Sequence, residues 1–526
     1  MTMRNISLLD CTLRDGGYIN NWRFGEAAIK SIIKKLEKTG IEMIEIGFIR
    51  GDSNESDTSL FPDTRSFKSV IGQKKQGVKY VGMIDMSAPV PLERITRNDK
   101  KTIDLIRVIF KKNKLEEALT YCSYIKMQGY EVFANFVNTD SYSDKEFIEG
   151  LEKVNSIQPD GVAIVDTFGM MKRRQFSRLV AIADNNLNED IILCYHAHNN
   201  LQQAFGNAET FVEMNLKRNI CIDACVFGMG RGAGNLNLEL FAEYMNENYG
   251  KSYRIAPMLE IMDEYLSDFY HKKFWGYSLP LYLSATSGCH PNYAIYLAEK
   301  DTLTVKAFSE ILYRITKEEK TVFNKEVAEK YYKDYVENYI EDKEVIGELR
   351  HIFSQKTVLI VAPGKSSSDN IPLINQIRST QNAIVVSVNF YDERFHPDYV
   401  FCSNMRKFSK LQQNNAFKMI VTSNITMSLI DGYVINYSSY LCRNDEVMDN
   451  AGLMLLRLLS NLTISKVLII GMDGYSDKKG NNVMNSTVSK NYFSEFGERN
   501  RLISEELQKL KKYVDFNFLT PTKYIF

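Results

Sequence analysis

The sequence lacks an excess of charge of either sign, and it also lacks a long apolar run. Its 526 residues include 65 lysines and arginines against 65 aspartates and glutamates. A neutral chain gives no support for binding nucleic acid or an anionic membrane surface, because both recognise basic patches. No apolar run reaches the length of a membrane span, and a strand-like segment beginning at Ser7 leaves no room for a signal peptide. We therefore expect neither a nucleic-acid nor a membrane partner.

The cysteines show no paired spacing, and histidine is rare. The eight cysteines are scattered, with no Cys-x-x-Cys pair. Such usage argues against a disulfide framework and favours a reducing cytoplasm. Only six histidines occur in the chain, so any two that stand close together are informative. The length and the 44% hydrophobic share suit two or three globular domains with a large core.

The first candidate site lies almost at the N-terminus, where a short apolar strand runs into Arg14 and Asp15 and then two glycines. Neither charge can be buried unpaired, so packing alone is a poor reason for this sequence. The carboxylate could hold a cation while the guanidinium holds a substrate oxygen. The alternative is an arginine–aspartate pair in a surface turn.

Two later segments carry similar signals. His196 and His198 follow the apolar run 191–193 in the same predicted strand. Because residues two apart in a strand point to the same face, both imidazoles could reach one metal ion. Core or surface histidines are the alternative. The glycine-rich stretch 227–235 follows another apolar strand, and its glycines allow the backbone to approach a ligand closely. A phosphate-binding glycine loop is the competing interpretation there.

Taken together, these motifs resemble those of a known superfamily. Thr-Leu-Arg-Asp-Gly near the start, His-x-His-Asn after a late strand and Gly-x-Gly-x-Gly-Ala-Gly-Asn after the next are similar to the motifs of the DRE-TIM metallolyases, the HMGL-like proteins. The resemblance covers roughly residues 5–250 and is closest to the 4-hydroxy-2-oxovalerate aldolase type. It implies a carbon–carbon lyase, a class II-type pyruvate aldolase, that acts through the enolate of a 2-oxo acid substrate.

The resemblance also implies a metal site and a role for the arginine. Asp15, His196 and His198 would be metal ligands, with Asn235 as a fourth ligand or as a loop-stabilising amide. Mixed oxygen and nitrogen ligands favour Mn²⁺, with Mg²⁺ or Co²⁺ also compatible, over a closed tetrahedral zinc site. Arg14 would face the keto oxygen, where negative charge grows as the enolate forms.

The remaining candidates concern substrate binding and proton transfer. Thr167 matches a hydroxyl residue that contacts the keto acid carboxylate, and Glu45 could position Arg14, bind a substrate hydroxyl or form an internal salt bridge. Tyr18 stands where the aldolases have a histidine base, and a phenol with a pKa near 10 is a weaker base at neutral pH. His290 or Tyr293, after the barrel, could replace it catalytically, unless they belong to a helix-capping turn.

The strand and helix pattern predicts the fold of the first 250 residues. Helical stretches separate most of eight strand-like segments, which predicts a (β/α)8 TIM barrel with its site at the carboxyl ends of the strands. A doubly wound open sheet is the alternative. The predicted strands are 7–9, 41–48, 80–84, 105–110, 131–137, 161–166, 191–198 and 220–227.

Two further regions follow the predicted barrel domain of residues 1–250. Residues 251–350 read as a helical lid or connector, whose tyrosines pack inward or at a homodimer contact. Residues 351–526 read as a smaller Rossmann-like α/β domain, similar to sialyltransferase-like and pterin-pyrophosphokinase-like domains. Gly364-Lys365-Ser366 lacks the first glycine of a Walker A loop. Nucleotide-sugar binding and a structural role are both open for this domain.

Two other functions remain as alternatives to the aldolase. One is a Claisen-type synthase that joins an acyl-CoA to a 2-oxo acid. The other is a redirected barrel that serves the C-terminal domain in glycan assembly, an interpretation supported mainly by Tyr18.

Overall fold

The computed structural model describes residues 5–51, 55–300, 302–411, 417–426, 429, 431–442, 444, 446–476 and 496–526. The chain forms two compact units, residues 1–291 and 292–526. The helical region predicted for residues 251–350 is therefore divided between the two units. Among the helices that the structure describes, none is both long and apolar enough to cross a membrane.

The first unit is a closed parallel barrel. Its strands follow the order β1-β9-β8-β7-β6-β5-β4-β2, and pairing of β1 with β2 closes the ring. The two-residue β3 (Leu60–Phe61) pairs in parallel with the end of β2. The TIM-barrel prediction is confirmed, and the open sheet is excluded. The eight barrel strands are β1 (Ile6–Asp10), β2 (Met43–Ile49), β4 (Lys79–Asp85), β5 (Leu105–Phe110), β6 (Glu131–Phe136), β7 (Gly161–Asp166), β8 (Ile192–Ala197) and β9 (Ile220–Ala224).

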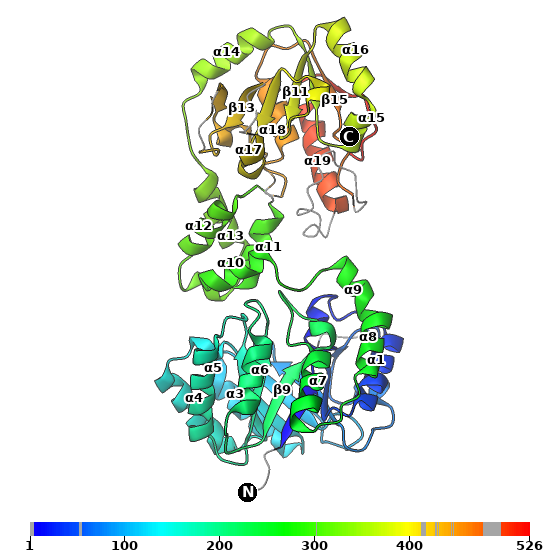
Figure 1. Cartoon of the computed structure of the whole chain (residues 1–526), viewed down its shortest axis with the longest axis vertical. Helices are drawn as coiled ribbons and strands as arrows, with labels where there is room; N and C mark the ends of the chain where they lie inside the picture. Colours follow the sequence, from blue (N-terminus) through cyan, green and yellow to red (C-terminus); the bar gives the residue numbers. More distant parts are fainter. Residues whose placement is uncertain are drawn as a thin grey trace. The chain divides into compact units, whose positions relative to one another are not determined.

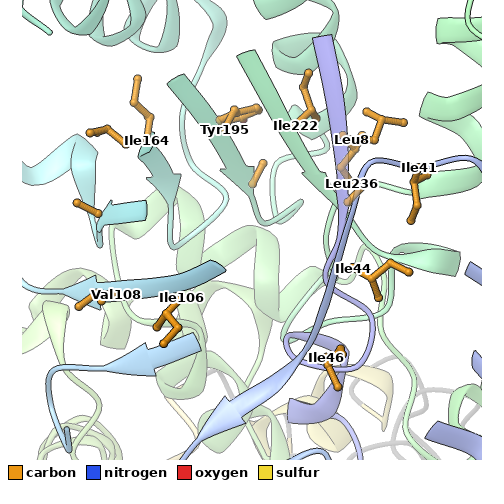
Figure 2. Packing of buried hydrophobic residues seen from close by; sticks show 14 of the residues in the cluster. Leu8, Ile41, Ile44, Ile46, Ile106, Val108, Ile164, Tyr195, Ile222 and Leu236 are labelled. Atoms are coloured by element: carbon orange, nitrogen blue, oxygen red, sulfur yellow. The ribbon is translucent and has the colours of Figure 1, made fainter. Parts of the chain in front are cut away.

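Helices surround this barrel, as the lower body in Figure 1 shows. Successive residues of each strand point to opposite faces, so the strands contribute to two cores. One residue packs inside the barrel, and the next packs outward against the helices. Figure 2 shows the outward cluster, which includes Leu8, Ile44 and Ile106. The helices of this unit are α1 (Glu26–Thr39), α2 (Lys68–Ile71), α3 (Leu115–Met127), α4 (Asp144–Ile157), α5 (Arg173–Asn186), α6 (Ala204–Glu213), α7 (Leu238–Tyr249), α8 (Ala256–Ile261), α9 (Ser267–Lys272) and α10 (Leu279–Ser287).

The barrel interior changes from apolar to polar along the strands. Its apolar cluster contains Leu105 of β5 and Cys221 of β9. Two residues further along the same strands stand the buried charges Arg107 and Asp223. Because residues two apart share a face, these charges also point inward, one layer nearer the carboxyl ends of the strands. The fold therefore places a polar layer directly beneath the barrel mouth, by which we mean the end where the strands finish.

The second unit contains helices and a second parallel sheet. The sheet order is β14-β13-β12-β11-β10-β15-β16, so the direction of winding reverses between β10 and β15. This parallel sheet agrees with the predicted α/β class, while its likeness to Rossmann-type domains stays a prediction. The strands are β10 (Thr357–Val361), β11 (Ile384–Val388), β12 (Tyr399–Cys402), β13 (Lys418–Thr422), β14 (Gly432–Ile435), β15 (Lys466–Ile470) and β16 (Phe516–Phe518).

Helices precede this sheet and connect its strands. The charged stretch from residue 325 to 348, predicted to be helical, forms two helices separated by residues 337–342. The helices are α11 (Pro291–Glu299), α12 (Val305–Arg314), α13 (Lys325–Val336), α14 (Lys343–Phe353), α15 (Lys365–Asp369), α16 (Ile371–Gln381), α17 (Met405–Leu411), α18 (Ala451–Ser460) and α19 (Phe496–Leu510).

Candidate metal centre and active site

Asp15 lies in a tight turn directly after β1. Its backbone N–H donates to the Cys11 carbonyl (2.8 Å), and a short 3₁₀ turn, Gly16–Tyr18, follows at once. A Cβ at position 17 would lie 2.1 Å from the Trp22 ring, so the turn requires glycine there. The Asp15 side chain is 1% exposed. The turn thus fixes this buried carboxylate at the barrel mouth.

The two histidines of β8 reach the same carboxylate. His196 Nε2 lies 2.8 Å from Asp15 Oδ2, and His198 Nε2 lies 3.7 Å from Asp15 Oδ1. The other ring nitrogens have partners of their own: His196 Nδ1 is 3.0 Å from Asp223 Oδ2, and His198 Nδ1 is 3.1 Å from the Asp166 carbonyl oxygen. When each Nδ1 carries a proton and donates it, both Nε2 lone pairs face Asp15, as a metal site requires.

Asp15, His196 and His198 form a compact group of possible metal ligands. Their ligand atoms all lie within 4.8 Å of one another, and all three side chains are buried. Asn235, on the loop after β9, forms a backbone bridge with His198. Its Nδ2 donates to the Met229 carbonyl, whereas its Oδ1 is buried with no hydrogen-bond partner among the described residues. The three predicted ligands Asp15, His196 and His198 are therefore assembled in one place, and the backbone of the fourth, Asn235, is paired with that of His198.

Two buried arginines connect this group to further carboxylates. Arg14 Nε donates to Glu45 Oε2 (2.6 Å), and Arg14 Nη1 donates to Asp15 Oδ2 (2.8 Å). Arg107 pairs with the other Glu45 oxygen, at 3.4 Å, and with Asp223. Glu45 thus engages both guanidinium groups, as the arginine-positioning and salt-bridge alternatives predict, and its substrate-binding role stays a prediction.

The buried charges shift one another's titration. Burial by itself would raise the pKa of Asp15, but the Arg14 guanidinium and the two imidazoles hold that pKa well below its usual range. Burial would lower the pKa of His196, yet its hydrogen bonds to Asp15 and Asp223 raise it well above the usual value. Burial lowers the pKa of His198. Asp15 is therefore ionised at neutral pH and His198 is neutral, the states in which each can bind a metal ion, whereas His196 has to release its Nε2 proton to bind one.

Comparison with known proteins finds a family model and curated relatives that match the first unit. Residues 96–260 match the HMGL-like family model. The barrel belongs to the HMGL-like family. It is 22% identical over 266 residues to a 4-hydroxy-2-oxovalerate aldolase of Bacillus cereus, a match that covers 50% of this chain and 76% of that protein.

One further curated protein and one solved structure are also similar to this barrel. An oxaloacetate decarboxylase of Mycobacterium tuberculosis is 24% identical, over 45% of this chain and 69% of that protein. The solved HMG-CoA lyase of Bacillus subtilis is 16% identical, with a TM-score of 0.41 over 51% of this chain and 93% of that one. The family model and the curated aldolase and decarboxylase relatives confirm the predicted membership of the DRE-TIM metallolyases.

The residues of the HMGL-like barrel fit a divalent cation. Besides Asn235 Oδ1, Asp15 Oδ1 is buried with no hydrogen-bond partner among the described residues. Leaving such oxygens without a partner is costly, and coordination to a cation would satisfy an oxygen of this kind. Two oxygens with two imidazole nitrogens are a donor set for Mn²⁺, Mg²⁺ or Co²⁺ rather than for a thiolate-rich zinc site.

Tyr18 does not have the environment of a base. Burial raises the pKa of Tyr18 above its usual value of 10, although the nearby Arg231 and Arg14 charges act in the opposite direction. Its ring packs edge-on against Trp22 at 4.7 Å between centroids, and the Arg231 guanidinium carbon lies 5.2 Å from its ring centroid. A phenol with a raised pKa is protonated at neutral pH, so this environment disfavours the predicted base role.

His290 and Thr167 lie at the barrel mouth. The His290 ring packs edge-on against Phe168, just after β7, with 5.5 Å between centroids. Burial, together with the charges of Arg231, Lys111 and His198, lowers the pKa of His290 to about 4, so its ring is neutral at pH 7. Thr167 Oγ1 accepts from the backbone N–H of Asn138 (2.8 Å). The hydroxyl proton of Thr167 has no acceptor among the described residues.

Tyr293 lies in the second unit, in α11. Its ring is fully buried, and its hydroxyl donates to the carbonyl oxygens of Glu319 (3.0 Å) and Val322 (3.1 Å). It also accepts from the backbone N–H of Asn324. These contacts hold α11 against the segment before α13, and they give no support to the predicted catalytic role.

Sequence reasoning missed two buried charges, Arg107 and Asp223. Both are essentially unexposed, and they pair with each other beneath the metal group. The available signal was an arginine in the otherwise apolar strand 105–110 and an aspartate in the otherwise apolar strand 220–224. A charge inside a barrel strand needs a partner in the same interior, and each of these two supplies the other's.

Proposed function

We propose that the barrel makes or breaks a carbon–carbon bond next to the keto group of a 2-oxo acid, through a pyruvate-like enolate. The observation that carries the proposal is the buried group Asp15, His196 and His198, with Arg14 hydrogen-bonded to its carboxylate. A divalent cation bound there supplies positive charge that stabilises the enolate oxygen. Among Mn²⁺, Mg²⁺ and Co²⁺, we favour Mn²⁺.

The reactions of the relatives support this choice of intermediate. Aldol cleavage of a 4-hydroxy-2-oxo acid and decarboxylation of oxaloacetate both release the enolate of a 2-oxo acid. An aldolase and a decarboxylase are both related to this barrel. The shared enolate is therefore better supported than any particular partner fragment, and 4-hydroxy-2-oxovalerate aldolase-like chemistry is the finer proposal.

Arg14 would stabilise the developing charge. Glu45 and Asp15 fix its Nε and Nη1, whereas its Nη2 has no hydrogen-bond partner among the described residues. A guanidinium held at two nitrogens keeps its orientation without reorganising during the reaction, so the third can donate to the keto oxygen as charge grows there. The Thr167 hydroxyl can donate to the substrate carboxylate.

Proton transfer requires a group that can accept a proton at C3 of the 2-oxo acid. His290 is in the accepting, neutral form at pH 7, whereas Tyr18 is not ionised. We assign the base to His290. In the condensation direction, the enolate carbon then bonds to the carbonyl carbon of an aldehyde, whose oxygen takes up a proton to give a 4-hydroxy-2-oxo acid. Cleavage runs the same steps in reverse.

The test is exchange of the methyl protons of pyruvate in deuterated water, followed by NMR with the purified protein and Mg²⁺. We expect exchange that needs both the metal and Asp15, and loss of both exchange and Mn²⁺ binding in Asp15→Asn. Asp190→Asn is the control, because Asp190 is exposed and precedes β8 at the opposite end of the barrel. Absence of exchange in a folded protein that binds Mn²⁺ would overturn the proposal.

A further inference from the structure

Arg231 is a cation at the barrel mouth without a compensating carboxylate. It stands between two glycines in the loop after β9 and is partly exposed. Its guanidinium forms no ion pair and no hydrogen bond with any residue in the described ranges. Arg14 and Arg107, by contrast, are each paired with two carboxylates. Arg231 is thus an arginine whose charge remains available to a ligand.

The loop that carries Arg231 is firmly held. Asn200 Oδ1 accepts from the Ala233 N–H (2.9 Å), and the Asn199 N–H donates to the Gly234 carbonyl (2.9 Å). A Cβ at Gly232 would lie 2.8 Å from Asn200 Oδ1, at a φ of +68°. The backbone on the C-terminal side of Arg231 is therefore tied to the segment that directly follows His198.

An aromatic ring holds the Arg231 side chain. The guanidinium carbon lies 5.2 Å from the centroid of the Tyr18 ring, and Tyr18 packs against Trp22 and Phe48. A cation–π contact orients a guanidinium without neutralising its charge. This gives Tyr18 a role other than that of a base, three residues beyond Asp15.

Lys111 is a second positive charge at this end of the barrel. Lys111 directly follows β5 at the same end of the barrel, is exposed and forms no ion pair within the described part of the chain. The charges of both Lys111 and Arg231 act on His290. The mouth therefore presents two uncompensated cations close to the proposed base.

We propose that Arg231, held over Tyr18, binds a second anionic group of the substrate, carried by the aldehyde or leaving fragment and not by the 2-oxo acid end. This inference rests on the proposed function and names its substrate class: 4-hydroxy-2-oxo acids with a distal carboxylate or phosphate. Both anions accept bidentate hydrogen bonds from a guanidinium.

The first experiment compares matched pairs of aldehydes in condensation with pyruvate, measured as kcat/KM. Succinic semialdehyde against butanal tests a carboxylate, and D-glyceraldehyde 3-phosphate against D-glyceraldehyde tests a phosphate. We expect the anionic member of one pair to be preferred by about 10- to 100-fold, since hydrogen bonds to a charged group contribute about 1.5–3 kcal/mol. Arg231→Met should abolish that preference, so that the anionic and the neutral member of the pair react with about the same kcat/KM.

The second experiment measures binding without turnover, by calorimetry. 2-Oxoglutarate and 2-oxovalerate differ only in a distal carboxylate in place of a methyl group. If the favoured anion is a carboxylate, 2-oxoglutarate binds about tenfold more tightly, and Arg231→Met removes the difference. Arg97→Met is the matched control, since Arg97 is exposed and its neighbour Asn98 bonds to the carbonyl just after α3, at the opposite end of the barrel.

The outcomes separate this inference from the proposed function. If the wild type shows no metal-dependent exchange of pyruvate, the proposed function fails. If exchange occurs but neither pair of aldehydes shows an anionic preference, or the preference survives in Arg231→Met, the inference about Arg231 fails alone. Loss of pyruvate exchange itself in Arg231→Met would place Arg231 on the shared 2-oxo acid carboxylate and would also overturn the inference.

Discussion

At the scale of single residues, the site depends on arginines that cannot move independently of their carboxylates. Arg14 is 5% exposed and bonds to both Glu45 and Asp15. Removing one member of a buried ion pair leaves the other charge desolvated and unpaired, which is strongly destabilising. Substitutions that keep the charge are therefore the informative ones here.

Arg14→Lys should reduce pyruvate exchange by about 10²- to 10³-fold, the usual effect of removing one donor to a developing oxyanion. Lysine keeps the positive charge but cannot bond to Glu45, Asp15 and a substrate oxygen at once. Exchange rates and Mn²⁺ titrations measure the two effects separately, and metal affinity should change much less than the rate. The control is Arg23→Lys, at an exposed ion pair with Asp57. Exchange in Arg14→Lys at the wild-type rate would contradict the assignment.

His290 should titrate near pH 4, well below an ordinary histidine near 6.5. The unfolded chain then binds more protons at His290 than the folded chain between these values. The contribution of His290 to stability is present above pH 6.5 and is lost as the pH falls toward 4. Its pKa should rise in Arg231→Met and in Lys111→Met, because burial acts together with those charges and with His198.

NMR of the imidazole protons measures this titration, with His290→Gln identifying the signal among the six histidines. Arg97→Met should leave the pKa unchanged. A His290 signal that titrates near 6.5 in the wild type would show that the ring is neither buried nor close to these cations.

At the scale of elements, the loop after β9 shapes the fourth metal position. A Cβ at Gly230 would lie 2.2 Å from Asn235 Nδ2, so no side chain fits there unless Asn235 moves. The amide of Asn235 is held by the Met229 carbonyl with its oxygen unpartnered among the described residues. Glycine at position 230 thus leaves the space that the Asn235 amide occupies in this orientation.

Gly230→Ala should lower Mn²⁺ affinity by about 10- to 100-fold, because it displaces a candidate ligand. Gly206→Ala is the control: Gly206 is exposed in α6, nothing lies within 4 Å of a Cβ there, and alanine should stabilise the protein by about 0.5–1 kcal/mol. Metal titration and thermal unfolding measure both variants. Unchanged Mn²⁺ affinity in Gly230→Ala would show that Asn235 is a loop amide only.

At the scale of the whole molecule, the chain consists of two compact units that meet in sequence at Pro291 and Asn292. The candidate metal group, Arg14, Arg231 and His290 all belong to the first unit. A unit with its own core can fold alone. The chemistry of the barrel should therefore not depend on the second sheet.

Residues 1–291 expressed alone should fold and keep metal-dependent exchange of pyruvate within a few-fold of the full chain. Circular dichroism and the NMR exchange assay test this, with Asp15→Asn in the same fragment as the control. The full chain should unfold in two thermal steps, of which only one shifts on adding Mn²⁺. A folded fragment without exchange would show that the second unit takes part in the site.

Sequence periodicity determined the fold of the first unit and much of the site. The alternation of apolar strand-like segments with helical stretches predicted all eight barrel strands to within a few residues of the observed ones. Each strand is apolar because one face packs inside the barrel and the other packs against the helices. The strand-end motifs then placed Asp15, His196 and His198 at one mouth, since the carboxyl ends of parallel strands meet there.

Only the tertiary structure decided which side chains meet. The pairing of Arg107 with Asp223, 116 residues apart, depends on the register around the closed barrel. So does the placement of the Arg231 guanidinium over the Tyr18 ring, from which we infer that Tyr18 supports a cation. Tyr293 falls in the second unit because the chain divides just before it. Local sequence fixes which face a residue occupies, whereas barrel closure and loop packing fix its partner across that face.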